Sequence, residues 1–487
     1  MKGLSFLNTQ EAHVDSSRIA LDALFHPRSM AIIGASEKPG SFNAGKTKLL
    51  LQHYKGTLYL VHPKHSVIFD QQTFPSVLDI PDHVDMALIM VPAPQVPQVV
   101  EECGQKGIAI VQILSGGFGE SGDEGRKMEN ALKESARRWN MRIVGPNCIG
   151  TYSPSEGIWL AEGSSSVSGN VGFISQSGGL AVDFVVRGNS MGLRYSKFVS
   201  IGNCIDLDHA DYLEYLANDP ETEIIGLYLE SVKNGRRFME ILKKITPHKP
   251  VVILKGGRTD AGMAATSSHT GGLAGAYDIW QAMFEQCGVI EVTSSEEMLD
   301  ALLALQLIRP SAGGVAMLGN GGGATVLATD SCMEEGLRFA ELSEETKEEL
   351  CGCSKSISDH NINPIDLPAM DLGRENGRVF GRILKLFADD ANTGYILFHL
   401  NLISFTNQGD LEGITARFTE EVIALAQSGA NILAVLRYSG CPAIENVRCA
   451  MAQALGEHGI PVFMTLDDGL RAIRFVNNLP QREVCHA

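Results

Sequence analysis

The sequence predicts an α/β protein built from three doubly wound domains in a row. The chain has 487 residues, which is too long for one ordinary core at about 150 residues per domain. One pattern occurs three times, at 29–36, 170–179 and 313–323: an apolar strand runs into a glycine turn, and a helical pattern follows. This pattern is typical of the first βα unit of a doubly wound domain.

Continuous apolar strands alternate with amphipathic helices after each of these openings. Strands that are apolar along their whole length indicate parallel sheets covered on both faces. We expect them at 57–61, 86–91, 108–114 and 142–144 in the first domain, at 196–201, 224–229, 251–254 and 289–292 in the second, and at 339–342, 394–400, 431–437 and 461–465 in the third.

Two segments rich in turn formers, 151–169 and 308–313, are the expected domain boundaries. Neither resembles a long disordered linker, so we expect the domains to pack together. The expected parts of the chain are an N-terminal extension at 1–20 and domains at 21–155, 156–308 and 309–487.

The composition argues against a nucleic-acid-binding protein. The net charge is −17, with 57 acidic against 40 basic residues. The ten cysteines form no CxxC pair, so we interpret Cys351 and Cys353 as part of a loop and expect no metal site in this chain. Free thiols, an N-terminus unlike a signal peptide and the absence of a run of about 18 apolar residues predict a cytoplasmic protein outside the membrane.

The most informative segment is 267–275, in which His269 stands among residues with very small side chains. Small neighbours let a bulky anion approach the backbone. Glu230 ends the expected strand 224–229, at the edge where open α/β sheets build their sites. A carboxylate bound to one ring nitrogen leaves the other free as a nucleophile. The segment therefore indicates either a histidine that is covalently phosphorylated or a histidine in a surface loop.

The first glycine turn, from Gly34-Ala35-Ser36 to Pro39-Gly40, fits a dinucleotide loop, a coenzyme A loop or a simple tight turn. It contains no GxGxxG. The second strand is followed by Lys64, a cation where NAD sites usually place a carboxylate for the ribose. A lysine at this place suits a phosphorylated ribose better, as in coenzyme A or NADP.

Residues 40–47 match the Walker A string completely, and we interpret the match as a coincidence. A Walker A loop must follow its strand directly, so that it wraps the phosphates at the helix N-terminus. Here the strand ends near Ile33 and several residues intervene. The later strand 86–91 ends in Pro92 and not in a magnesium-binding aspartate.

The second glycine turn opens the expected helix 180–190 with Ser177, Gly178 and Gly179. The free N–H groups of a helix N-terminus and a serine hydroxyl can hold a phosphate, although an ordinary N-cap has the same residues. In one domain with His269 and Glu230, the turn completes a set of nucleophile, orienting carboxylate and anion site.

Together the motifs resemble the α subunit of nucleoside-diphosphate-forming acyl-CoA synthetases (the ADP-forming acetate–CoA ligase type), relatives of succinyl-CoA synthetase. The resemblance runs from about Leu21 to Val476. It rests on motifs in a fixed order at 33–36, 62–64, 91–93, 116–120, 145–148, 175–179, 227–230 and 268–271. It implies a Rossmann-like CoA-binding domain followed by two flavodoxin-like ligase domains.

The resemblance also implies a role for each matching position. His269 would be phosphorylated and Glu230 would orient it. The phosphate-binding positions would be Ser177, Gly178, Gly179, Thr270 and Gly271. The positions that bind coenzyme A would be Gly34, Ala35, Ser36, Pro39, Gly40, Lys64, Val91, Pro92, Ala93, Ser115, Gly116, Gly117, Phe118, Asn147 and Cys148.

The implied reaction converts acyl-CoA, phosphate and ADP or GDP into a carboxylic acid, CoA and ATP or GTP, through an acyl phosphate and a phosphohistidine. The chain shows no ATP-grasp pattern, so we expect a β subunit that supplies the nucleotide and Mg²⁺, in an α2β2 assembly. A non-catalytic CoA-binding regulator of the same fold is the alternative, and an NAD(P)-dependent oxidoreductase is less favoured. The sequence leaves open the acid, the nucleotide and the physiological direction.

Three departures from the family pattern stand out. Residues 42–44 replace a glycine that often follows the first turn. Cys204 stands where many relatives have a charged residue, and we interpret it as a buried small side chain, with substrate tuning as the alternative. The third glycine turn, 320–323, is interpreted as structural and not as an anion site.

Overall fold

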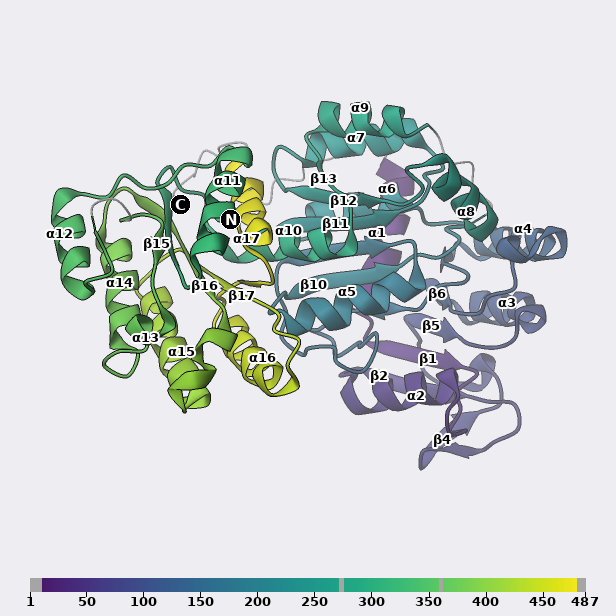
Figure 1. Cartoon of the computed structure of the whole chain (residues 1–487). Helices are drawn as coiled ribbons and strands as arrows, with labels where there is room; N and C mark the ends of the chain where they lie inside the picture. The colour runs from purple at the N-terminus through teal and green to yellow at the C-terminus, as the bar shows by residue number, and fades with distance from the viewer. Residues whose placement is uncertain (1–10, 271–275, 359–361, 480–487) are drawn as a thin grey trace. The chain divides into compact units, whose positions relative to one another are not determined.

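The computed structural model describes residues 11–270, 276–358 and 362–479. They form an α/β chain with three mostly parallel sheets, as the sequence predicted (Figure 1). The chain divides into two compact units, the first formed by 1–189 with 194–298 and the second by 190–193 with 299–487. The first unit contains two of the sheets. Across the described residues, no helix combines the length and the apolar character that a membrane span requires.

The first sheet has the strand order β3-β4-β2-β1-β5-β6-β7. Its strands are β1 (Ser29–Ile33), β2 (Thr57–Val61), β3 (Val67–Ile68), β4 (Gln71–Phe74), β5 (Met86–Ile89), β6 (Ile110–Ile113) and β7 (Arg142–Val144). All pair in parallel except β3, which is antiparallel to β4. The chain order reverses between β1 and β5, and in such sheets ligands bind where the strands diverge at their carboxyl ends.

Four helices belong to this part of the chain: α1 (Glu11–Phe25), α2 (Phe42–His53), α3 (Val96–Lys106) and α4 (Asp123–Trp139). The helix α2 begins directly after the first glycine turn. Its N-cap is Ser41, whose Oγ accepts a hydrogen bond from the Ala44 N–H. The helix α1 runs across residue 21, where the sequence suggested a domain boundary.

The second sheet has the order β13-β12-β11-β9-β10-β8. Its strands are β8 (Thr151–Tyr152), β9 (Val171–Ser175), β10 (Tyr195–Ser200), β11 (Ile224–Leu229), β12 (Val251–Lys255) and β13 (Ile290–Val292). The helices are α5 (Gly178–Ser190), α6 (His209–Asn218), α7 (Gly235–Ile245), α8 (Asp260–Thr270), α9 (Tyr277–Cys287) and α10 (Ser295–Leu307). The switch point of this flavodoxin-like order lies between β9 and β11.

The segment 151–169, expected to be a loop between domains, contains the strand β8. Its residues Thr151 and Tyr152 pair with β10 in the antiparallel sense, and the Tyr152 side chain is fully buried. Two residues are too few for a periodic pattern, so this strand could not be predicted from the sequence.

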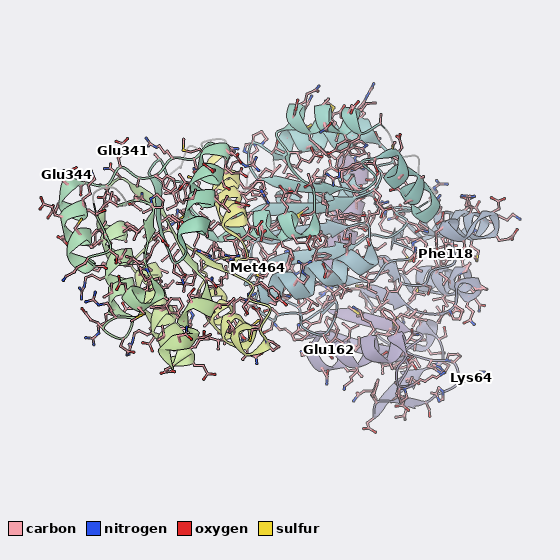
Figure 2. All side chains as sticks on the ribbon, in the orientation of Figure 1. Lys64, Phe118, Glu162, Glu341, Glu344 and Met464 are labelled. Carbon is pink, nitrogen blue, oxygen red and sulfur yellow. The ribbon has the colours of Figure 1, made fainter. Side chains whose placement is uncertain are left out.

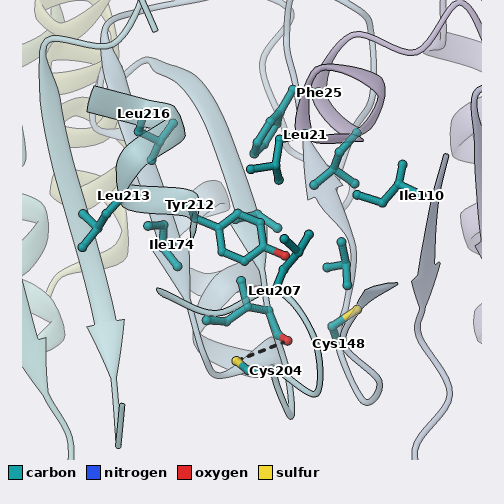
Figure 3. Close-up of a cluster of buried hydrophobic side chains, with 14 of the residues drawn as sticks. Leu21, Phe25, Ile110, Cys148, Ile174, Cys204, Leu207, Tyr212, Leu213 and Leu216 are labelled. Atoms are coloured by element: carbon teal, nitrogen blue, oxygen red, sulfur yellow. Dashed lines mark hydrogen bonds between the residues drawn. The ribbon is translucent and has the colours of Figure 1, made fainter. Parts of the chain in front are cut away.

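The two sheets of the first unit share one hydrophobic core. In Figure 3, Leu21 and Phe25 of α1 lie between Ile110 of the first sheet and Leu213 and Leu216 of α6. Because α1 is packed against both sheets, the first two domains form one body, and a site can be built from residues of both.

The second unit contains the sheet β15-β14-β16-β17-β18, all in parallel. Its strands are β14 (Gly314–Gly319), β15 (Ile365–Asp366), β16 (Thr393–Leu400), β17 (Ile432–Leu436) and β18 (Val462–Phe463). Its helices are α11 (Gly322–Glu334), α12 (Glu344–Cys353), α13 (Ala369–Leu372), α14 (Arg378–Asp389), α15 (Leu411–Gln427), α16 (Pro442–Glu457) and α17 (Leu466–Asn477).

The strand expected at 339–342 is wrong. Only a single bridge joins Phe339 to Val315, and the edge strand next to β14 is β15. The bridge consists of the Val315 N–H donating to the Arg338 carbonyl (2.8 Å) and the Ala340 N–H donating to the Val315 carbonyl (2.9 Å). Ala340 and Leu342 are buried in the core of this unit although the segment forms no strand, so hydrophobicity alone misled the assignment.

Candidate active site

The N-terminus of α5 lies at the switch point of the second sheet. The Gln176 N–H donates to the Tyr228 carbonyl (3.0 Å) and the Ser175 hydroxyl donates to the Ser177 carbonyl (2.7 Å). The Leu180 N–H donates to Ser177 Oγ (3.4 Å). The turn is therefore fixed to the ends of β9 and β11. The first N–H groups of a helix have no partner within it, so α5 offers donors to an anion here.

Glu230 lies beside this helix N-terminus and is only 4% exposed. Its N–H donates to Gln176 Oε1 (2.8 Å), and the Tyr228 hydroxyl donates to its carboxylate (3.1 Å). Burial raises the pKa of Tyr228, and the Glu230 carboxylate raises it further. Gln176 thus connects the expected anion site to Glu230. Its role was not predicted, although its place between two serines at the end of β9 was the available signal.

Lys255 is a second residue whose role the sequence did not reveal. It ends β12 and is 1% exposed, and its Nζ lies 5.1 Å from the centre of the Trp280 ring. The Nζ donates to the carbonyl of Glu230 (2.8 Å) and to that of Gly256. Burial lowers the pKa of Lys255 to about 8, while the Glu230 carboxylate acts in the opposite direction. The lysine thus holds the end of β11 and the turn that precedes α8.

The backbone of His269 and Thr270 forms the last turn of α8. Their side chains, and all of Gly271, lie outside the described residues, so the distance from His269 to Glu230 stays a prediction. The start of α8 is fixed by Gly257, which has φ +75° and where a Cβ would lie 2.6 Å from Thr266 Oγ1. The sequence predicted a strand and a turn before His269, and the structure adds a helix that carries it.

A cavity of about 400 Å³ joins the two domains of the first unit. Its eleven lining residues are Phe42, Leu114, Asn147, Cys148, Ile149, Gln176, Ser177, Gly178, Gly179, Gly202 and Asn203. Asn147 and Cys148, expected in the CoA site, therefore share one cavity with the expected phosphate-binding residues Ser177, Gly178 and Gly179. The other six lining residues, Phe42, Leu114, Ile149, Gln176, Gly202 and Asn203, were not predicted as site residues.

The loops that close this cavity touch each other directly. Asn147 has φ +59°, and its side chain donates to Asn203 Oδ1 (3.4 Å). At Gly202, with φ +54°, a Cβ would lie 2.2 Å from the Pro146 carbonyl oxygen. Only glycine fits where the loop of the second domain meets that of the first.

Asn203 is held by two carboxylates of the first domain. Its amide donates to Glu120 (2.6 Å) and to Glu129 (2.9 Å). Glu120 also accepts the N–H groups of Gly117 (2.6 Å) and Phe118 (3.1 Å). Burial raises the pKa of Glu120, but the hydrogen bonds from Asn203 and the backbone outweigh it and leave the pKa below its usual value. Glu120 therefore orders the loop of Gly117 and Phe118, two of the positions expected to bind coenzyme A.

The expected CoA residues differ in what they can touch. The side chains of Ala35, Ala93 and Phe118 are buried, so only their backbone could meet a ligand (Phe118 is labelled in Figure 2). Lys64 is exposed between β2 and β3, as Figure 2 shows. Cys148 is 5% exposed and burial raises its pKa to about 12, so it forms a wall of the cavity and not a nucleophile.

The other expected CoA positions lie around the switch point of the first sheet. Those that are exposed or partly exposed are Gly34, Ser36, Pro39, Gly40, Val91, Pro92, Ser115, Gly116, Gly117 and Asn147. At Gly34, with φ +91°, a Cβ would lie 3.0 Å from the Met90 carbonyl group. Asn43 donates to the carbonyls of Gly34 (2.8 Å) and Met90 (2.9 Å). These hydrogen bonds thus hold the turn against the end of β5. The backbone on the exposed side of the turn can contact a nucleotide directly.

The match to the Walker A string is a coincidence. Lys46 is 5% exposed, and its Nζ donates to the carbonyls of Trp159 (2.9 Å) and Leu160 (3.2 Å). Thr47 donates to the Asn43 carbonyl (2.7 Å) within its own helix. Both side chains that a Walker A motif needs for phosphate and magnesium are therefore occupied inside the protein.

Two further sequence features have a clear environment. Cys204 is 3% exposed, does not line the cavity, and burial raises its pKa to about 12. In the second unit, the Asn320 side chain binds the backbone of Asn401 (2.8 and 3.1 Å), and the Gly321 N–H donates to Asp366 (2.6 Å). Such bonds are typical of a structural turn, in agreement with the interpretation of 320–323 from the sequence. Whether Cys204 or this turn has a functional role stays a prediction.

Two family profiles match the chain. A CoA binding domain matches residues 28–154, and a succinyl-CoA ligase-like flavodoxin domain matches residues 168–305. These are the domains that contribute the two sides of the cavity. The chain therefore combines a domain of the CoA-binding family with a flavodoxin-like domain of the succinyl-CoA ligase type.

Curated relatives extend the likeness over nearly the whole chain. The ADP-forming acetate–CoA ligase I of Archaeoglobus fulgidus is 37% identical over 94% of this chain, which spans 63% of that single-chain relative. The α subunit of ADP-forming acetate–CoA ligase I of Pyrococcus furiosus is 42% identical over 73% of this chain and 78% of the relative. The chain belongs to the family of ADP-forming acetate–CoA ligases.

Solved structures agree with this assignment. A dinucleotide-forming acetyl-coenzyme A synthetase 1 of Candidatus Korarchaeum cryptofilum, in complex with phosphate and ADP, superposes with a TM-score of 0.78 at 26% identity. The match covers 94% of this chain and 96% of that one. A crystal structure of a Pyrococcus horikoshii protein gives a TM-score of 0.77 at 31% identity, over 94% and 98% of the two chains.

Proposed function

We propose that this chain carries the CoA site and the phosphohistidine of an acyl-CoA ligase that forms a nucleoside triphosphate. The observation that supports it best is the single cavity in which Asn147 and Cys148 of the CoA-binding domain face Ser177, Gly178 and Gly179 at the N-terminus of α5. This brings the expected position of the thioester within reach of the expected position of phosphate.

The first two steps use this chain alone. A phosphate oxygen attacks the thioester carbonyl, the C–S bond breaks, and CoA leaves as the acyl phosphate forms. A ring nitrogen of His269 then attacks phosphorus, the P–O bond to the acyl group breaks, and the carboxylate leaves. The N–H groups at Gly178 and Gly179 stabilise charge on the phosphoryl oxygens. Glu230 holds the histidine in the tautomer that leaves one nitrogen free.

The last step passes the phosphoryl group to ADP or GDP. We assign the nucleotide and its Mg²⁺ to an ATP-grasp partner, in an α2β2 assembly, because this chain has no ATP-grasp pattern. The Pyrococcus relatives are named as α subunits, which supports a separate partner, whereas the Archaeoglobus relative is one longer chain. His269 would have to travel between two sites for this transfer.

Labelling of the chain without a partner tests this function. The chain is incubated with an acyl-CoA and radiolabelled phosphate, and the protein is analysed by intact mass and by acid lability. We expect one phosphoryl group per chain, lost in acid, absent in His269→Ala and unchanged in His458→Ala, which removes an exposed histidine of the second unit. Labelling of the mixture with an ATP-grasp partner and Mg-ATP or Mg-GTP then identifies the nucleotide.

The same experiment separates the alternative. If the chain binds CoA by calorimetry but neither acyl-CoA with phosphate nor the partner with Mg-ATP labels it, the catalytic function is wrong. A CoA-binding regulator of the same fold would then be the better account.

A further inference from the structure

The side-chain amide of Gln176 is buried and has a fixed orientation. The residue is 9% exposed and lies directly before Ser177, at the turn that opens α5. Its Oε1 accepts the N–H groups of Glu230 (2.8 Å) and Ser231 (3.3 Å). Because both of these groups are donors, they can only be bound by the oxygen of the amide. The amide nitrogen, Nε2, therefore points away from the end of β11.

This Nε2 group is available to a ligand in the cavity. Among the residues that the structure describes, none accepts a hydrogen bond from it. Protein atoms do not enclose it completely, and Gln176 lines the cavity together with Ser177, Gly178 and Gly179. A buried donor without an acceptor is costly, so we expect the acceptor to be part of the bound ligand.

The surroundings of Nε2 favour an anion as this ligand. Gly178 and Gly179 begin α5, whose first N–H groups have no acceptor within the helix. A hydrogen bond from an amide to an oxyanion is stronger than one to a neutral oxygen. A tetrahedral anion has several oxygens, so one of them can face the helix N-terminus while another faces Nε2.

We propose that Gln176 is a phosphate-binding residue, and that its Nε2 donates to an oxygen of the phosphate at the N-terminus of α5. The identity of the anion rests on the proposed function. The same side chain holds the N–H of Glu230, while Lys255 Nζ holds the carbonyl of that residue (2.8 Å). Gln176 thereby fixes the position of phosphate relative to the strand end that carries Glu230.

NMR of the side-chain amides tests the contact directly. The full chain is isotope-labelled at the side-chain nitrogen of glutamine, and the Gln176 signal is assigned by its absence in Gln176→Met and Gln176→Glu. Inorganic phosphate is added with and without CoA, and sodium chloride of equal ionic strength is the control. The matched control residue is Gln281, which is exposed on α9 of the same domain and outside the cavity.

We expect the Gln176 amide protons to shift downfield and to saturate at the phosphate concentration that calorimetry gives, while the Gln281 signal stays still. Gln176→Met should weaken phosphate binding by about 10- to 100-fold, as for one hydrogen bond to a charged group, and Gln281→Met should leave it unchanged. In the labelling reaction, Gln176→Met should raise the phosphate concentration for half-maximal labelling by a similar factor, with unchanged CoA affinity.

The two variants of Gln176 differ in what they keep. Gln176→Met leaves the N–H groups of Glu230 and Ser231 without their acceptor, so its urea midpoint should fall. Gln176→Glu keeps an acceptor for both groups but has an oxygen in place of Nε2. Its urea midpoint should therefore lie closer to that of the wild type, although phosphate binding stays weak.

Three results would overturn the inference. They are a Gln176 signal that stays still while phosphate binds, a Gln176→Glu variant that binds phosphate as tightly as the wild type, and a wild-type chain that binds no phosphate. The proposed function fails separately. If phosphate shifts the Gln176 signal in a chain that acyl-CoA with phosphate and the partner with Mg-ATP never label, the binding role stands and the catalytic function is wrong.

Discussion

Lys46 allows a sharp test of the structure. It lies in α2, 5% exposed, with its Nζ donating to the carbonyls of Trp159 and Leu160. Burial lowers its pKa from 10.5 to about 8. We replace it by methionine, which has a similar length and flexibility and no charge, so that packing is nearly kept while the amine is lost.

The pH dependence follows from the two protonation states. Above pH 10.5 the lysine is neutral in both the folded and the unfolded chain. As the pH falls from 10.5 to 8, Lys46 takes up a proton in the unfolded chain but not yet in the folded chain. The free energy of unfolding therefore falls as the pH is lowered through this window, and it rises as the pH is raised. With these two pKa values, the stability of the wild type relative to Lys46→Met should increase by roughly 2 kcal/mol between pH 7.5 and 9.5.

Urea titration followed by tryptophan fluorescence measures this difference. The three tryptophans of the chain, Trp139, Trp159 and Trp280, all lie in the first unit together with Lys46, so their signal reports that unit alone. Subtracting the variant from the wild type at each pH cancels the tyrosines and cysteines that titrate in the same range. If wild type and Lys46→Met differ in their free energy of unfolding by the same amount at both pH values, Lys46 is not a buried lysine with a lowered pKa. Loss of ATP binding in Lys46→Met with unchanged stability would instead support the Walker A interpretation.

Three more changes test the site. A Cβ at Gly179 meets no atom within 4 Å, so Gly179→Ala should stabilise the first unit in urea by up to about 1 kcal/mol, yet raise the phosphate concentration for half-maximal labelling about tenfold; unchanged phosphate dependence would remove this residue from the anion site. Glu230→Gln should slow histidine labelling by about 100-fold with unchanged CoA affinity, and a normal rate would exclude the orienting role. Gly202→Ala brings a Cβ 2.2 Å from the Pro146 carbonyl and should cost at least about 2 kcal/mol in urea. Gly45→Ala, inside α2 with open space around it, should instead stabilise by up to about 1 kcal/mol, and equal effects of the two changes would contradict the contact between the two loops.

The architecture was predictable because each domain begins with the same local signal. At β1, β9 and β14, a buried apolar strand and a glycine turn leave the chain few options other than a parallel sheet with a helix on its face. Element boundaries followed from turn chemistry. The failures lie at or next to sheet edges: β3, β8 and β15 have two residues each, β4 has four, and 339–342 joins its sheet by a single bridge. Whether a short segment becomes an edge strand depends on which neighbouring strand still has unpaired backbone groups. Tertiary packing decides this, and the local sequence does not.

The site was predictable only where one motif carries its own chemistry. The turn at Ser177 and the strand end at Glu230 could be predicted as candidates because their position on the sheet follows from local sequence. Asn203 and Phe42 were not predicted because they line one cavity only when the second domain packs on the first. The common core through α1 sets that packing, and no short-range pattern in the sequence encodes it.

The helix α2 shows how far a string match and a structure can diverge. Phe42, Lys46 and His53 stand four and seven residues apart, so they project from one side of the helix. Phe42 lines the cavity, Lys46 holds the carbonyls of Trp159 and Leu160, and His53 stacks on the Trp159 ring at 3.6 Å. Lys46, which belongs to the Walker A string, therefore binds the segment of Trp159 and Leu160 between the two domains. The same helix begins with Phe42, which lines the cavity.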